Sequence, residues 1–315
     1  MEAKRYRRLC RLVDQLAPQG RRGRQQFSDA VIAKVFFHAT HCDRPVSWAC
    51  REENWPREPV LRHQAVGFTL PSQSTMSRRL RTVGLLQLIE RVQAALAEEL
   101  SREQPVLKAI DSKPLRVGCY SKDPDAKRGH CGRGEKARGY KLHTVTCGDA
   151  FLCFTVLPMN VNDQVGAAML LPRLGRTTTT AGDGSRQAWG YVSADNAYDA
   201  NPVYRAAAAV NHQLIAPPRR ANAHVRDTRR NCPQRIRSLD ICANPLSHCG
   251  LGESFGLGLL RQRKQIERDL GHAVMDGLYA PPPWVRRPHR VAAWAAAKLI
   301  QRMMRQVELL ELRTR

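Results

Sequence analysis

The sequence lacks the apolar segments that membrane and secreted proteins need. No stretch of about 18 apolar residues occurs, which argues against a membrane-spanning helix. Residues 1–8 contain no apolar signal core, and we therefore expect the chain to stay in the cytoplasm.

Closely spaced cysteine pairs are also absent. The ten cysteines are scattered without a Cys-x-x-Cys pair or the spacing of a disulfide framework, so in a reducing compartment they should be free thiols. A zinc site from Cys232, Cys242, Cys249 and His248 is conceivable. Without a Cys-x-x-Cys pair, ordinary buried or loop cysteines are the favoured interpretation.

Acidic residues are scarce relative to basic ones. Lys and Arg total 51 against 28 Asp and Glu, which leaves a formal net charge of +23. Such an imbalance is typical of a protein with a polyanionic partner, and nucleic acid is favoured over a membrane surface. The apolar fraction of 43% is ordinary for a folded protein, and 315 residues suffice for two domains or for one domain with an arm.

Residues 1–104 are predicted to form a helical region that binds DNA. Apolar residues recur at helical spacing over 28–38, after Ser28 as N-cap. A short helix carrying Arg78, Arg79 and Arg81 should end at Gly84, before a longer helix over 85–100. Helix, turn and arginine-bearing helix indicate a DNA-contacting arm. A plain helical bundle with a solvated basic face is the alternative.

Residues 105–315 are predicted to form an α/β domain. Alternating or continuous apolar runs of strand length indicate strands at 106–110, 139–146, 151–157, 191–194 and 212–216. Helical patterns cover 163–174, 202–210 and most of the chain from 256 onward. This alternation predicts a mixed sheet flanked by helices.

Two basic segments, at about 118–138 and 217–237, are expected to be loops. The second contains many arginines and little apolar content, and it should lie against phosphates and become ordered on binding. A solvated loop without a ligand is the alternative. Its arginines are Arg219, Arg220, Arg226, Arg229, Arg230, Arg235 and Arg237.

Three acids are the candidates for chemistry. Asp111 follows the strand predicted at 106–110, Asp195 follows the one at 191–194, and Glu267 lies in a helical segment. Converging carboxylates can hold two Mg²⁺ ions for phosphodiester cleavage. Taken alone, an isolated Asp is more often a cap or turn residue than a ligand, and Glu267 would be an ordinary helix-surface acid. The acids most easily mistaken for members of the set are Asp163, Asp199 and Asp269. Asp199 could instead cap the helix that begins near Pro202.

The ordered motifs resemble the DDE transposases of bacterial insertion sequences. The matching segments are Ile-Asp-Ser-Lys-Pro around Asp111, Gly-Tyr-Lys-Leu-His at 139–143, Asn-Val-Asn-Asp at 160–163, Ala-Asp-Asn-Ala-Tyr-Asp around Asp195, and Arg263 four residues before Glu267. The resemblance implies an RNase H-like catalytic domain over most of the region from about 70 to 305. Asp111, Asp195 and Glu267 would then be the catalytic and metal-binding acids.

The resemblance also implies a reaction and its partners. Two Mg²⁺ or Mn²⁺ ions would support DNA cleavage at the inverted-repeat ends of an element and strand transfer into target DNA. Transposition joins two DNA ends, and a homodimer on DNA would hold both of them. The resemblance also implies a bacterial cytoplasmic protein that lies at the nucleoid when it is bound to DNA. Arg263 would bind a phosphate or hold Glu267, unless it forms only a surface ion pair. Further candidate DNA contacts are Lys113, Arg78, Arg79, Arg219, Arg220, Arg229 and Arg230.

The sequence departs from the family pattern in two places. Related transposases often have a basic residue seven positions after the glutamate, where this chain has Val274. Arg268 could substitute for it, or the copy could be impaired. No tryptophan lies between Asp195 and Glu267, so a hairpin intermediate is not predicted. The alternatives to a transposase are an RNase H-like nuclease without strand transfer and a catalytically decayed DNA-binding protein.

Overall fold

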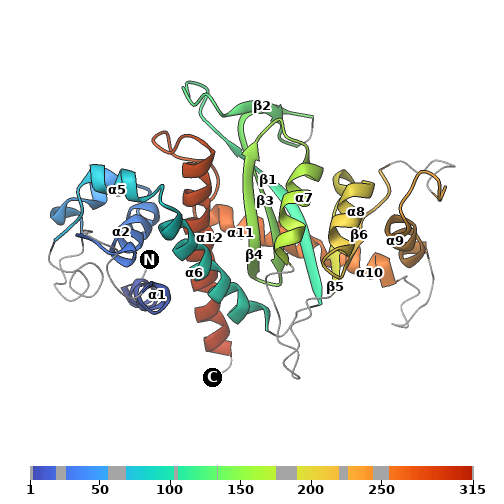
Figure 1. The fold of residues 1–315 in the computed structure, drawn as a ribbon, viewed down its shortest axis with the longest axis horizontal. Helices are drawn as coiled ribbons and strands as arrows, with labels where there is room; N and C mark the ends of the chain where they lie inside the picture. Colours follow the sequence, from blue (N-terminus) through green and yellow to red (C-terminus); the bar gives the residue numbers. More distant parts are fainter. Residues whose placement is uncertain are drawn as a thin grey trace.

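The computed structural model describes residues 3–18, 26–55, 69–102, 106–132, 134–174, 190–219, 226–243 and 255–313. In these residues a mixed sheet lies between two groups of helices, with further helices from the N-terminal part beyond one group (Figure 1). The predicted α/β class, with a mixed sheet flanked by helices and a helical N-terminal region, is confirmed.

The sheet combines antiparallel and parallel pairing. Its strands are β1 (Leu107–Arg116), β2 (Lys127–His130), β3 (Lys136–Cys147), β4 (Ala150–Pro158), β5 (Gly190–Ser193) and β6 (His212–Ile215). Strand β3 pairs antiparallel with β1, β2 and β4, whereas β1–β5 and β5–β6 are parallel. Strands β2 and β4 follow one another along the edge of β3 opposite β1, because β2 pairs with 136–139 and β4 with 140–147.

Helices cover both faces of the sheet. One face carries α7 (Asp163–Leu174) and α8 (Asn201–Ala208), and the other carries α6 (Val83–Ser101), α10 (Phe255–Gln262), α11 (Lys264–Met275) and α12 (Pro288–Arg313). Helix α9 (Pro233–Ala243) contacts β6, α8 and α10, and the 3₁₀ helix η2 (Asn196–Tyr198) follows β5. Every helix in these described ranges is too short or too polar to span a bilayer.

The N-terminal helices pack on α6 and α12, on the side away from the sheet (Figure 1). They are α1 (Ala3–Leu16), α2 (Asp29–His41), α3 (Val46–Ala49), the 3₁₀ helix η1 (Glu52–Asn54) and α5 (Gln73–Arg79). Gly84 does not end a helix as predicted, because α6 begins at Val83 and includes it. A Cβ at Gly84 would come within 3.1 Å of the Asp29 carboxylate, so a small residue lets α6 approach the start of α2.

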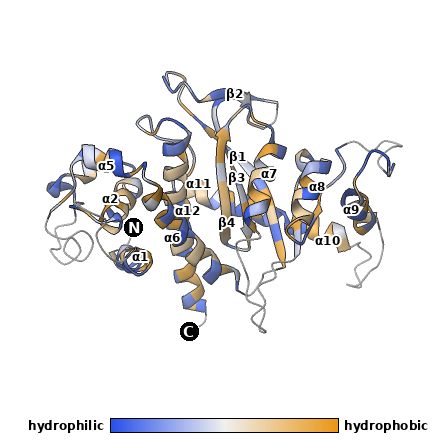
Figure 2. Ribbon diagram, in the orientation of Figure 1, coloured by the Kyte–Doolittle hydropathy of each residue, from blue (hydrophilic) through white to orange (hydrophobic). Residues whose placement is uncertain are grey.

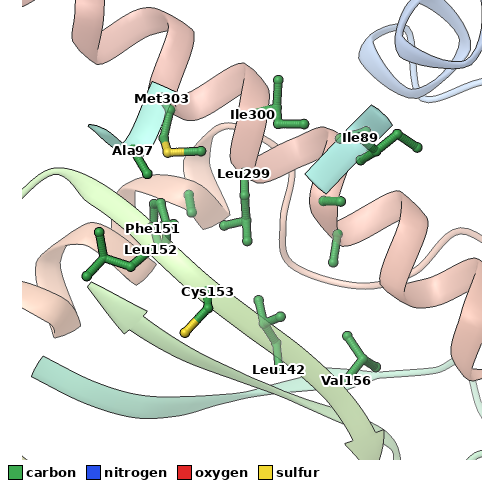
Figure 3. Close-up of a cluster of buried hydrophobic side chains, with 14 of the residues drawn as sticks. Ile89, Ala97, Leu142, Phe151, Leu152, Cys153, Val156, Leu299, Ile300 and Met303 are labelled. Atoms are coloured by element: carbon green, nitrogen blue, oxygen red, sulfur yellow. The ribbon is translucent and has the colours of Figure 1, made fainter. Parts of the chain in front are cut away.

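One hydrophobic core runs from the N-terminal helices to the sheet. Figure 2 shows hydrophobic residues concentrated along α6, α12 and the central strands. In Figure 3, Leu299 of α12 lies over Leu142 of β3 and Val156 of β4. Each of these side chains is at least nine-tenths buried, and burial of such a side chain contributes about 1.5–3 kcal/mol to folding. The core therefore ties α12, near the end of the chain, to the central strands.

Strand β1 is longer than predicted, and Asp111 lies in its interior. The strand continues through Pro114 because β1 pairs with β3 along its whole second half. The Val117 amide donates to the Arg138 carbonyl on β3, so amides two and four residues earlier point the same way and the nitrogen of Pro114 faces the other edge. There β5 pairs with β1 only as far as Ala109, and no ladder hydrogen bond is lost.

The two segments expected to be loops are partly regular structure. Strand β2 and the start of β3 form a hairpin within 118–138, where the Arg138 side chain donates to the carbonyls of Ser121 (2.7 Å) and Ala126 (2.9 Å). Helix α9 begins at Pro233, inside 217–237. In each segment one arginine side chain makes an internal contact, Arg138 with the Ser121 carbonyl and Arg235 with Asp199. The composition of a segment does not reveal such contacts. The described residues leave out 220–225.

Candidate active site

The two aspartates lie at the same level of two neighbouring parallel strands, Asp111 within β1 and Asp195 after the end of β5. Ala109 of β1 pairs with Ser193 of β5, and Asp111 and Asp195 each come two residues later. Asp195 is the N-cap of η2, where its Oδ1 accepts a hydrogen bond from the Ala197 amide at 2.9 Å. The cap role expected for an isolated Asp therefore exists, but it engages one oxygen and leaves the carboxylate half-buried beside Asp111.

Helix α11 supplies the third acid. Arg263, at the N-cap position of α11, contacts Glu267 through Nη2 at 2.7 Å and Asp111 through Nη1 at 3.6 Å. The guanidinium therefore bridges an acid of the sheet and an acid of the helix. This arrangement is more than the surface i,i+4 pair that the sequence allowed, because its second partner lies on β1.

Negative charge exceeds positive charge around Asp111. Burial raises the pKa of Asp111 to about 7, the Ser112 amide opposes this shift, and the carboxylates of Asp195 and Glu267 add to it. Arg263 lowers the pKa only in part. Burial also raises the pKa of Asp195. The site would be stabilised by an added cation, since the ionised carboxylates repel one another.

The donor set fits a hard divalent cation by its chemistry. Carboxylate oxygens are the ligands that Mg²⁺ prefers, and the carboxylates of Asp195 and Glu267 are close enough to Asp111 to raise its pKa. In the described part of the chain, however, no three His, Cys, Asp or Glu side chains converge closely enough to hold a metal ion. One reason is that the Glu267 carboxylate contacts Arg263, with 52% of its side chain exposed.

The opposite face of β1 carries a second polar cluster. The Ser112 hydroxyl donates to Oδ1 of Asp163 at 2.8 Å, and Lys141 Nζ lies 3.2 Å from the same oxygen. His143 is fully buried beside them, and burial lowers its pKa to about 4. Helix α7 packs so closely here that a Cβ at Gly166 would come within 2.5 Å of the His143 ring. Asp163 is thus neutralised by Lys141 and lies on the other side of the sheet from α11.

Asp199 and Asp269 are outside the site. Asp199 is buried and accepts from Nη2 (2.6 Å) and Nε (2.7 Å) of Arg235 and from the Tyr204 hydroxyl (3.2 Å). It does not cap α8 as suggested, since the N-cap of that helix is Ala200. Asp269 is buried, and Gln265 donates to its Oδ1 at 2.8 Å. Asp199 is held by its neighbours, whereas Oδ2 of Asp269 has no hydrogen-bond partner among the described residues, and neither acid contacts Arg263 there.

The predicted DNA-contacting arginines of α5 have different environments. Arg79 is 8% exposed and donates to the Phe27 carbonyl at 2.8 Å and to the Asp29 carboxylate at 2.7 Å. The DNA contact predicted for Arg79 is therefore wrong, because its guanidinium joins α5 to the start of α2. Arg78 is exposed in the last turn of α5, and Arg81 is exposed in the turn that follows the helix.

The other basic candidates are spread around the sheet edge. Lys113 lies two residues after Asp111 on the same strand face, and burial lowers its pKa while Asp111 raises it. Arg219 is exposed and lines a surface pocket together with Asp163 and Ala197. Arg220 lies outside the described residues. Arg229 and Arg230 are exposed in the turn before α9.

Two further positions complete the comparison with the predicted site. Val274 is half-buried in the last turn of α11, and the exposed side chain next to Glu267 is Arg268, which donates to Gln265 at 2.5 Å. The conceivable zinc ligands His248 and Cys249 lie outside the described residues. Sequence reasoning missed the Ser112–Asp163 contact, for which the only signal was the Asn-Val-Asn-Asp segment ending at Asp163.

The comparison with known proteins identifies the family. Residues 102–276 match the family described as Transposase DDE domain, and this segment is more than half of the chain. The chain therefore belongs to the transposase DDE domain family. Membership in a transposase family implies DNA binding, and this family generally uses divalent metal ions. Neither the curated proteins nor the solved structures yielded a match.

Proposed function

We propose that this protein is a transposase that cleaves DNA at the inverted-repeat ends of an insertion sequence and joins the freed ends to target DNA. Asp111, Asp195 and Glu267 are the proposed catalytic acids. The observation that carries the proposal is the Arg263 bridge between Asp111 and Glu267, beside Asp195 at the same level of the parallel strands.

The three acids are also the proposed metal ligands, for one or two Mg²⁺ or Mn²⁺ ions. Such ions would activate the attacking oxygen and stabilise the leaving oxygen of the phosphodiester. The excess of carboxylate charge around Asp111 supports this assignment. Arg263 is the proposed positioning residue, because it holds Glu267 near the sheet while the carboxylates are not neutralised by a metal.

The DNA would lie along the exposed basic side chains. Arg219 is one of these and borders the pocket next to Asp163, while half-buried Lys113 lies two residues from Asp111 on β1. Arg78, Arg229 and Arg230 are further candidates for phosphate contacts, because they are exposed in a chain with a net charge of +23. Each such contact would contribute to affinity without selecting a sequence.

The direct test is incubation with duplexes that carry the flanking inverted repeats, in Mg²⁺ or Mn²⁺, with nick positions mapped. A parallel reaction with pre-cleaved ends tests joining. Nicks at the repeat ends and joined products are expected, and both should disappear in Asp111→Asn and in EDTA. Cleavage without joining would identify a nuclease instead of a transposase.

A catalytically decayed DNA-binding protein is the second candidate function. Val274 favours it, because related transposases often have a basic residue there. This candidate predicts that wild type and Asp111→Asn bind the same DNA and that neither nicks it. A Val274→Lys variant that gains cleavage would show that the site is otherwise complete.

A further inference from the structure

A pocket opens between the N-terminal helices and the segment that leads into α12. Residues of α2, α3 and α5 line one side, and residues 282–294 line the other. Its apolar walls include Phe36, Leu80, Val285 and the rings of Trp284 and Trp294. Trp284 is 43% exposed, so one aromatic face borders solvent while Trp294 is buried. A flat aromatic ligand could therefore stack at the mouth of this pocket.

Positive charge surrounds the apolar walls. Arg44, Arg81, His289 and Arg290 line the pocket and are all exposed. Burial and the guanidinium groups of Arg290 and Arg81 lower the pKa of His289, so the positive charge of the rim comes from the three arginines. Among the described lining residues the one acid is Asp43, and Lys298 neutralises it at 2.8 Å. The pocket thus favours an aromatic ligand that carries negative charge next to its ring.

The two tryptophans that line the pocket differ in exposure, and only Trp284 borders solvent. Trp294 is 3% exposed, and its indole N–H has no hydrogen-bond partner in the described structure. An unsatisfied buried donor of this kind costs about 1–3 kcal/mol. Because this nitrogen is itself buried, stacking of a ligand would use the exposed ring of Trp284.

We propose that this pocket receives one unpaired nucleobase of the bound DNA, with the neighbouring phosphates on the arginine rim. A nucleotide combines a flat ring with adjacent anionic phosphates, and base stacking on aromatic side chains does not depend on a particular base sequence. The proposal rests on the proposed function only in taking DNA as the ligand. Exposed Arg78 lies on α5 beside the pocket, so the phosphate track would continue onto the N-terminal helices.

Equilibrium binding of the full chain in EDTA tests the proposal without any cleavage. The probes are three short duplexes of one arbitrary sequence: blunt, with a single unpaired base at one end, and with an abasic nucleotide at that end. Wild type should bind the base-bearing duplex more tightly than the abasic one, by about 5- to 150-fold. Trp284→Ala should lose this preference and keep its affinity for the blunt duplex, while Trp284→Phe should retain most of it.

Two further variants keep the test decisive. Ala293→Leu would fill the pocket from α12 with a good helix former and should also abolish the preference, even if Trp284→Ala folds poorly. Tyr279→Ala removes an aromatic ring that is 64% exposed outside the pocket and should change nothing. Equal affinity of wild type for base-bearing and abasic duplexes, or an unchanged preference in both pocket variants, would overturn the proposal. Neither result depends on whether the acids cleave DNA.

Discussion

Asp111 and Asp199 are two carboxylates of the same α/β core with opposite charge environments. Asp199 is enclosed by the Arg235 guanidinium, the Tyr204 hydroxyl and the Arg219 amide, which together satisfy its oxygens. Asp111 has one guanidinium at 3.6 Å and two further acids nearby. A carboxylate satisfied by the protein holds the fold together. A carboxylate that the protein does not neutralise marks a site where an added cation would be stabilising.

The largest expected effect is the loss of DNA nicking when Asp111 is substituted. Asp111→Asn is expected to reduce DNA nicking in Mg²⁺ by about 10²–10³-fold or more, because an amide is a poor ligand and removes transition-state charge stabilisation. The matched control is Asp269→Asn, which removes a different buried carboxylate whose pKa is also raised to about 7. Mapped nicks quantify both variants, and equal loss in the control would argue against a specific site.

For the free energy of unfolding, substitution of Asp199 should have a large effect. Asp199→Asn is expected to lower the free energy of unfolding by about 3 kcal/mol, since Arg235 would lose its buried partner. Glu135→Gln breaks the exposed pair with Arg116 and should leave the unfolding midpoint close to that of wild type. Urea unfolding measures both values. A small change in Asp199→Asn would show that the enclosed carboxylate is not a structural anchor.

The pH dependence of stability tests the environment of Asp111. Burial raises the pKa of Asp111 in the folded chain to about 7, above its usual value, so the folded state retains a proton that the unfolded state releases. This contribution is fully present below about pH 4 and is lost as pH rises to about 7. Without metal, Asp111→Asn should therefore gain on wild type by about 1 kcal/mol or more across this window.

The pH measurement must use the difference in stability between Asp111→Asn and wild type, because other groups titrate in the same range. The lowered pKa values of His143 and His212, each about 4, make stability rise with pH over much of the same range. Their effect cancels in the difference between the two proteins. Chemical unfolding at several pH values in EDTA measures this difference in stability. A stability gain of the variant that shrinks toward pH 7 would contradict the environment described for Asp111.

A smaller contrast separates two neighbouring arginines of α5. Arg79→Ala should destabilise the fold by about 2 kcal/mol, because Asp29 and the Phe27 carbonyl would lose their donor. Arg78→Ala should leave stability within about 0.5 kcal/mol and lower the salt dependence of DNA binding by about one contact. Unfolding curves and affinities at several salt concentrations test the pair together.

Local patterns anticipated most of the elements that position the site. Helix α7 has the predicted bounds, and strands β3, β4, β5 and β6 lie where alternating or apolar runs predicted them. These elements follow from short-range periodicity, which the sequence displays directly. Strand β1 was predicted too short, because its second half is stabilised by pairing with β3 and has a weaker pattern of its own.

The sequence was a poorer guide to the use of each charged side chain. Arg79 and Arg235 belong to basic segments that suggest DNA contacts, yet both guanidinium groups bind internal carboxylates. Their partners, Asp29 and Asp199, are 50 and 36 residues away in the sequence. No local pattern reveals such distant pairing.

Residue order and composition were enough to predict an α/β chain with a strong positive charge and three ordered acids, and to point to its family. They could do so because periodicity, charge and motif order are properties of neighbouring residues. The folded chain was needed to bring Asp111 beside Asp195, to bridge Asp111 and Glu267 through Arg263, and to turn Arg79 inward. These outcomes depend on which distant segments pack together, and that packing is decided by strand pairing and by the shared core.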